Sequence, residues 1–149
     1  MTTAYASDST SQQDIARRGS RMLFADATFL LGAGSMGMLF ELLGHFVNVG
    51  PLARAFNKSP STVVFFEAHG LAVLTAAPLY RAGAKDQQRW WHLYAALVHT
   101  LLGGANLLFW RTFIYFRAIP LGIITTIAHV GFVIAQGSSF VLSRRDKHS

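Results

Sequence analysis

Ten ionisable or amide side chains lie inside stretches of the sequence that are otherwise apolar. An ionisable group in hydrocarbon costs roughly 2.5 to 3.5 kcal/mol even on lenient insertion scales, so each such group needs a reason to be there. Carboxyl and imidazole groups can exchange protons, and amides can hold a ligand by hydrogen bonds. The residues concerned are Asp26, Glu41, His45, Glu67, His69, His92, His99, Asn106, His129 and Gln136.

Glu41 and Glu67 are the residues that we predict to carry acid–base chemistry. Apolar surroundings disfavour the ionised form of a carboxyl group, so one of the pair can donate a proton while the other accepts one. This suits isomerisation, cyclisation or another proton transfer on a lipophilic small molecule, such as a quinone, an isoprenoid or a polyketide. We expect ligand orientation or proton relay from His45, His99 and His129.

Spacing decides which of these groups can meet, because a helix turns about 100° per residue. His92, His99 and Asn106 are spaced by seven residues and therefore share one face of a helix. On this face Asn106 is the predicted substrate-binding residue. Two further segments each place their polar or small residues along one side: Thr125, His129 and Gln136 in one, and Gly34, Gly37, Glu41 and His45 in the other.

Depth along each helix gives a second criterion. Counting about 1.5 Å per residue places His99 and His129 near the middle of a membrane, where they could face each other. Glu41 and Glu67 fall in the outer half, so we expect one polar cavity with two carboxylates above two imidazoles. Glu67 and His69 point to nearly opposite sides of their helix, and we favour Glu67 as the inward residue. His92, close to the interfacial residues Trp90 and Trp91, is interpreted as structural.

Three other interpretations stay open. In the first, the chain is an electron-transfer subunit in which His99 and His129 bind a b-type haem. A quinone could replace the haem as the redox group of such a subunit. A non-enzymatic accessory or transporter-like subunit would use its polar stripes to bind a partner helix or to conduct protons. Glu41, His45 and Glu67 have the ligand types for zinc or iron, but no diagnostic spacing, and we predict no metal site.

The composition indicates the environment that these residues occupy. The chain of 149 residues is 52% hydrophobic and 13% charged, with a mean hydropathy of +0.34. Crossing a hydrocarbon core takes roughly 20 mainly apolar residues, and none of the candidate stretches has the charged face of a soluble helix. We therefore predict an all-α, integral membrane four-helix bundle with a polar tail at 1–21, a basic tail at 143–149, and spans at about 22–47, 62–80, 90–110 and 119–142.

Basic residues predict the orientation, because Lys and Arg are retained on the cytoplasmic side of short loops. The two tails and the second connection contain nine of them, and the other two connections contain four. Both termini are therefore expected in the cytoplasm. The net charge of +6 is then explained by basic residues that face the anionic lipids of the cytoplasmic leaflet, and we predict no binding of nucleic acid. Because four helices form only a thin bundle, we expect a homo- or hetero-oligomer. The absence of cysteine excludes disulfides and thiol nucleophiles.

A glycine-rich segment resembles a nucleotide-binding fingerprint but has the wrong context. Gly32-Ala33-Gly34-Ser35-Met36-Gly37 matches GxGxxG, yet it lies within an apolar helix with no strand before it. Small residues here, and at Gly103, Gly104 and Ala105, are instead expected to let neighbouring helices approach closely.

The segment Glu67-Ala68-His69-Gly70-Leu71-Ala72-Val73-Leu74, which leads to Arg81, resembles the second-helix pattern of DoxX-like four-helix membrane proteins. In that pattern a glutamate precedes a glycine pair, a leucine-rich run and a cytoplasmic arginine. His69 stands where the first glycine would be, so only Glu67 and Gly70 correspond. The resemblance implies a small four-helix membrane protein with quinone-linked or other membrane redox work.

Overall fold

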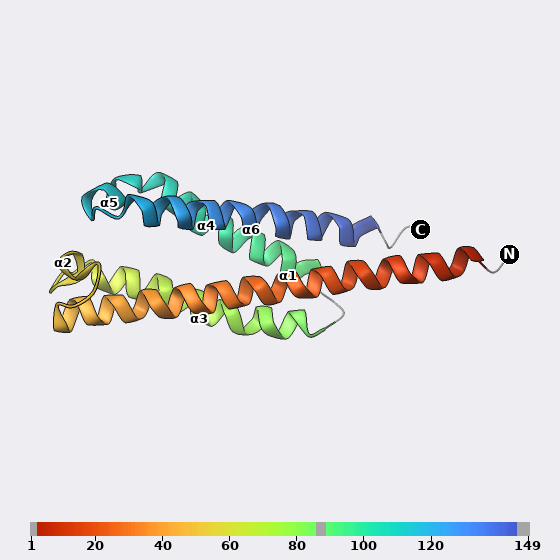
Figure 1. Ribbon diagram of the computed structural model, residues 1–149, viewed down its shortest axis with the longest axis horizontal. Helices are drawn as coiled ribbons and strands as arrows, with labels where there is room; N and C mark the ends of the chain where they lie inside the picture. The colour runs from red at the N-terminus through yellow and green to blue at the C-terminus, as the bar shows by residue number, and fades with distance from the viewer. Residues whose placement is uncertain (1–2, 86–88, 146–149) are drawn as a thin grey trace.

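The computed structural model describes residues 3–85 and 89–145, and within these ranges the chain is helical with no strand. In chain order the elements are α1 (Thr3–Leu42), the π-helical turn η1 (Leu43–Val47), α2 (Ala53–Phe56), α3 (Thr62–Gly83), α4 (Arg89–Leu108), α5 (Trp110–Tyr115) and α6 (Ile119–Arg145). The four long helices are α1, α3, α4 and α6, and short helical segments lie between α1 and α3 and between α4 and α6 (Figure 1).

The long helices lie roughly along one axis as two pairs, α1 with α3 and α4 with α6 (Figure 1). Helix α1 connects the pairs through smaller contacts with α4 and α6. The beginning of α1 and the end of α6 lie toward the same end of the molecule, and α2 and α5 lie at the other. The connections therefore reverse the chain at both ends, so that successive long helices run in opposite directions.

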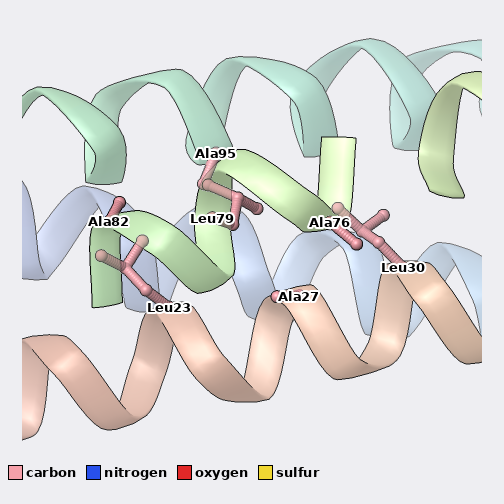
Figure 2. Close-up of a cluster of buried hydrophobic side chains, with 7 residues drawn as sticks. All are labelled: Leu23, Ala27, Leu30, Ala76, Leu79, Ala82 and Ala95. Atoms are coloured by element: carbon pink, nitrogen blue, oxygen red, sulfur yellow. The ribbon is translucent and has the colours of Figure 1, made fainter. Parts of the chain in front are cut away.

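The apolar core is built from leucine and alanine (Figure 2). Alanine brings helix backbones close together, and leucine fills the space that remains. Helix α1 supplies Leu23, Ala27 and Leu30, which meet residues of α3 and one residue of α4. The whole cluster comprises Leu23, Ala27, Leu30, Ala76, Leu79, Ala82 and Ala95.

Glycine sets the approach of α1 to α3, as predicted. A Cβ added at Gly34 would lie 2.8 Å from the backbone oxygen of His69, and one added at Gly37 would lie 2.6 Å from the His69 ring. A Cβ at Gly103 would lie 3.1 Å from the Cβ of His129, so Gly103 makes room for that side chain. The same prediction is wrong for Gly32 and Gly104, because a Cβ at either position would meet nothing within 4 Å.

Three helical segments in the described chain are long and apolar enough to cross a membrane: Ala16–Val47, Thr62–Gly83 and Ile119–Ser143. The surface supports the same environment, because large apolar side chains are exposed while several polar side chains are buried. The protein is therefore an all-helical membrane protein. Helix α4 falls outside this set, since His92, His99 and Asn106 make it less apolar, but its exposed side chains include Leu97 and Leu101.

The helix boundaries differ from those expected at both ends of the chain. Helix α1 begins at Thr3 and continues through the segment predicted as a tail. Its 40 residues correspond to about 60 Å, twice the hydrocarbon thickness of about 30 Å, so α1 extends beyond a bilayer. The stretch predicted at 90–110 ends at Leu108, and α5 follows it. Helix α6 continues to Arg145, and the predicted tail residues 146–149 lie outside the described chain.

Candidate functional site

Asp26 is the centre of a buried hydrogen-bond chain that joins three helices. Its side chain, on α1, has no exposed surface. One carboxylate oxygen accepts a hydrogen bond from Nε2 of His99 on α4 at 2.7 Å, and the other accepts one from the amide Nε2 of Gln136 on α6. Both oxygens are thus occupied by donors, which is how a carboxylate is stabilised away from water.

The chain of hydrogen bonds continues in both directions from Asp26. Nδ1 of His99 lies 2.8 Å from Nδ1 of His129, and Nδ1 of His92 lies 2.6 Å from the amide oxygen of Gln136. One assignment of protons satisfies every contact. His129 donates to His99, His99 donates to Asp26, and His92 donates to Gln136, which itself donates to Asp26. This leaves Nε2 of His129 as an acceptor without a partner in the described chain.

Aromatic rings enclose the two central imidazoles. Phe132 stacks on His99, with ring centroids 4.6 Å apart and an interplanar angle of 11°. Phe29 of α1 lies edge-on to His129 at 6.0 Å. These rings hold the imidazoles in place and surround them with apolar atoms, which strengthens their hydrogen bonds. Asp26 and His99 are fully buried, whereas His129 is only half-buried, so His129 is the accessible member of the chain.

The polar faces of α4 and α6 meet in register, as their spacing predicted. His92 pairs with Gln136, His99 with His129, and Asn106 with Thr125, whose hydroxyl accepts from the Asn106 amide at 3.1 Å. The prediction that His99 and His129 face each other is confirmed. Asn106, predicted to bind substrate, uses its amide donor for this contact within the protein.

Glu41 is buried, as expected, but its partner is His69. Glu41 is 1% exposed, and its Oε1 lies 2.6 Å from Nδ1 of His69. The prediction that Glu67 faces inward is wrong, because its side chain is exposed. Residues two apart lie about 200° apart on a helix, so turning His69 toward α1 turns Glu67 away. Glu41 and Glu67 consequently do not form the expected acid–base pair.

His45 ties the first connection to the end of α1. Its Nδ1 donates to the backbone oxygen of Phe56 at 3.1 Å, and the hydroxyl of Thr62 donates to the same oxygen at 3.0 Å. The structure thus replaces the single expected cavity by two separate groups. One is the chain centred on Asp26, and the other is the Glu41–His69 pair.

The haem alternative does not fit this arrangement. A metal–imidazole bond is about 2 Å long, so axial ligation would separate two ligating nitrogens by roughly 4 Å. Nδ1 of His99 and Nδ1 of His129 are 2.8 Å apart, and Asp26 occupies the other nitrogen of His99. Within residues 3–85 and 89–145, no group of three His, Cys, Asp or Glu side chains could hold a metal ion.

Sequence reasoning assigned no chemical role to Asp26, Gln136 or His92, although all three take part in the hydrogen-bond chain. The sequence marks Asp26 as a costly residue, but no residue spacing connects it to His99, which is 73 positions away. The signal that could have singled it out is energetic. A carboxylate within an apolar helix requires donors, and the structure supplies them from α4 and α6.

Comparisons with family models, curated proteins and solved structures found no match to this chain. The DoxX-like resemblance therefore stays a prediction, and the function has to be argued from geometry.

Proposed function

We propose that this membrane protein uses His129 to exchange a proton with a lipophilic small molecule, with His99 and Asp26 as the relay behind it. The single observation that carries the proposal is the unbroken hydrogen-bonded sequence His129–His99–Asp26, at 2.8 and 2.7 Å. A carboxylate behind an imidazole fixes its tautomer and stabilises the imidazolium that forms on protonation.

The proton inventory of the relay balances. When Nε2 of His129 accepts a proton, its Nδ1 proton can move to Nδ1 of His99. His129 is then neutral again, and His99 is an imidazolium whose charge the Asp26 carboxylate stabilises. The reverse sequence returns the proton to the ligand, so one group serves as base and as acid.

Gln136 limits how far a proton can travel. An amide donates and accepts hydrogen bonds but does not titrate, so the link from Asp26 through Gln136 to His92 is not a proton path. The chain thus favours a local acid–base site over a conduit through the membrane. This supports a membrane-embedded isomerase, cyclase or oxidoreductase, and the lipid-facing position favours quinones, isoprenoids or polyketides as substrates.

The proposal includes four membrane spans with both termini in the cytoplasm. Helix α4 is 20 residues long, about 30 Å, and lies beside α6. Its polar residues face α6 while Leu97, Leu101 and Leu107 are exposed, which suits a helix that turns an apolar face to lipid. The distribution of basic residues supports the orientation.

The test compares His129→Asn with Thr125→Val in the full chain. Asparagine places its amide nitrogen where Nδ1 of His129 lies, so it keeps a donor to His99 but cannot carry a proton. Mass spectrometry of small molecules that copurify in lipid nanodiscs should show roughly a tenfold loss in His129→Asn, the value of one strong hydrogen bond. Thr125→Val, on the same face of α6, should retain the wild-type set. Equal retention in both variants would contradict the proposal.

A further inference from the structure

The Glu41–His69 pair is separate from the Asp26 chain. Glu41 and Asp26 lie on the same helix, 15 residues and therefore about 22 Å apart along it. Glu41 faces α3, and no hydrogen bond in the described chain joins the two groups. The Glu41–His69 pair is therefore a polar group distinct from the one that contains His129.

One oxygen of this pair has no partner. Oε2 of Glu41 is buried and accepts no hydrogen bond in the described chain. The proton between Glu41 and His69 can reside on either side, but in both cases Oε2 is an acceptor. An unsatisfied buried acceptor costs about 1 to 3 kcal/mol, so Oε2 would gain stability from a donor. A group with a hydrogen-bond donor, such as a hydroxyl, would complete it.

An apolar groove lies near the pair, between the end of α1 with η1 and the start of α3, although neither Glu41 nor His69 lines it. It has a volume of about 380 Å³, within the range of roughly 300 to 1,000 Å³ that is typical of small-molecule sites. Leu42, Val63 and Phe66 are among its lining residues, together with His45. Leu42 follows Glu41, and Phe66 precedes His69 by about one helical turn, so one end of the groove lies within a turn of the pair on each helix.

The accessible member of the pair is His69, whose side chain is 39% exposed. Its ring occupies the space that Gly37 leaves free, and it covers the buried Glu41. An imidazole turned toward lipid needs a polar partner of its own. The ligand should therefore carry its polar group at one end and an apolar body at the other.

We infer that Glu41 and His69 form a second binding site, for the hydroxyl head of a lipophilic molecule whose apolar body lies in this groove. The site does not rest on the function proposed for His129. It gives roles to two residues that the Asp26 chain leaves unused, Glu41 as the buried acceptor and His45 as part of the groove wall.

The test uses decylhydroquinone and its dimethyl ether as probes on the full chain, labelled with ¹⁵N-histidine in lipid nanodiscs. The two probes differ only in whether they have hydroxyl donors. The hydroquinone should shift the His69 imidazole resonance, assigned by its absence in His69→Gln, and the ether should not. If both probes shift it equally, or neither does, the inference is overturned.

Matched variants test the two halves of the site. Val63→Trp fills the groove, whereas Val64→Trp places the same bulk at a neighbouring exposed position that does not line it. Val63→Trp and Glu41→Gln should each weaken the hydroquinone response roughly tenfold or more, while Val64→Trp and His129→Asn leave it unchanged. Equal effects of the two tryptophans would rule out the groove. An unchanged response in Glu41→Gln would rule out the carboxylate.

Discussion

At the scale of single residues, the two buried carboxylates, Asp26 and Glu41, each have a hydrogen-bond partner on another helix. Asp26 has two donors, and Glu41 has the imidazole of His69. In a low-dielectric interior such bonds are strong, and the loss of one partner leaves the other desolvated. The positions of the donors, more than the acidic residues alone, therefore determine where a proton can reside.

Asp26→Asn tests this balance. The amide has one acceptor oxygen where the carboxylate has two, so either His99 or Gln136 loses its acceptor. We expect a loss of about 1 to 3 kcal/mol in the free energy of unfolding, together with a change of tautomer at His99 or His92. Denaturant titration and ¹⁵N spectra of the imidazoles would measure both. Asp14→Asn, at an exposed position of α1, is the control, and equal behaviour of the two variants would refute the assignment.

At the scale of elements, the approach of α1 to α3 depends on glycine. Gly34 faces the backbone of α3, which cannot move aside as a flexible side chain can. This distinguishes Gly34 from Gly32, two residues earlier on the same helix, where an added Cβ would meet nothing within 4 Å. The close contact of α1 with α3 is also what brings His69 to Glu41.

Gly34→Ala should separate the two helices. Overpacking of this kind costs about 1 to 3 kcal/mol, and the Glu41–His69 hydrogen bond should lengthen or break. Gly32→Ala should leave stability equal or slightly higher, because alanine is the better helix former. Thermal unfolding in nanodiscs and the His69 imidazole resonance would report the two effects. A Gly34→Ala protein as stable as Gly32→Ala would disprove the close approach.

At the scale of the whole molecule, the distribution of polarity is inverted relative to that of a soluble protein. Leu101, Leu108 and Ile134 are among the most exposed side chains, whereas Asp26, His99 and Gln136 are buried. An apolar solvent reverses the usual preference, because leucine then gains nothing from burial and polar groups must find partners inside.

Cysteine labelling can test the proposed four-span arrangement, since the chain has no cysteine of its own. We expect an impermeant maleimide to label Asn57→Cys and Arg117→Cys on intact cells, and to label Ala84→Cys only after permeabilisation. Arg117 decides the number of spans. If α4 did not cross the membrane, residues 84 and 117 would lie on the same side, and labelling at 117 would then also require permeabilisation.

The sequence by itself determined the membrane environment, the helical class and the polar faces of α4 and α6. Composition and the seven-residue spacing are local properties, and a helix turns regularly, so His99 and His129 could be placed on facing stripes in advance.

Only the tertiary structure decided which helices contact one another and with what rotation. The periodicity of α3 allows either Glu67 or His69 to face inward, and the close contact of Gly34 and Gly37 with α3 selects His69. Asp26 gains its donors from two helices far along the chain. Such choices depend on packing between segments distant in sequence, and no local pattern encodes them.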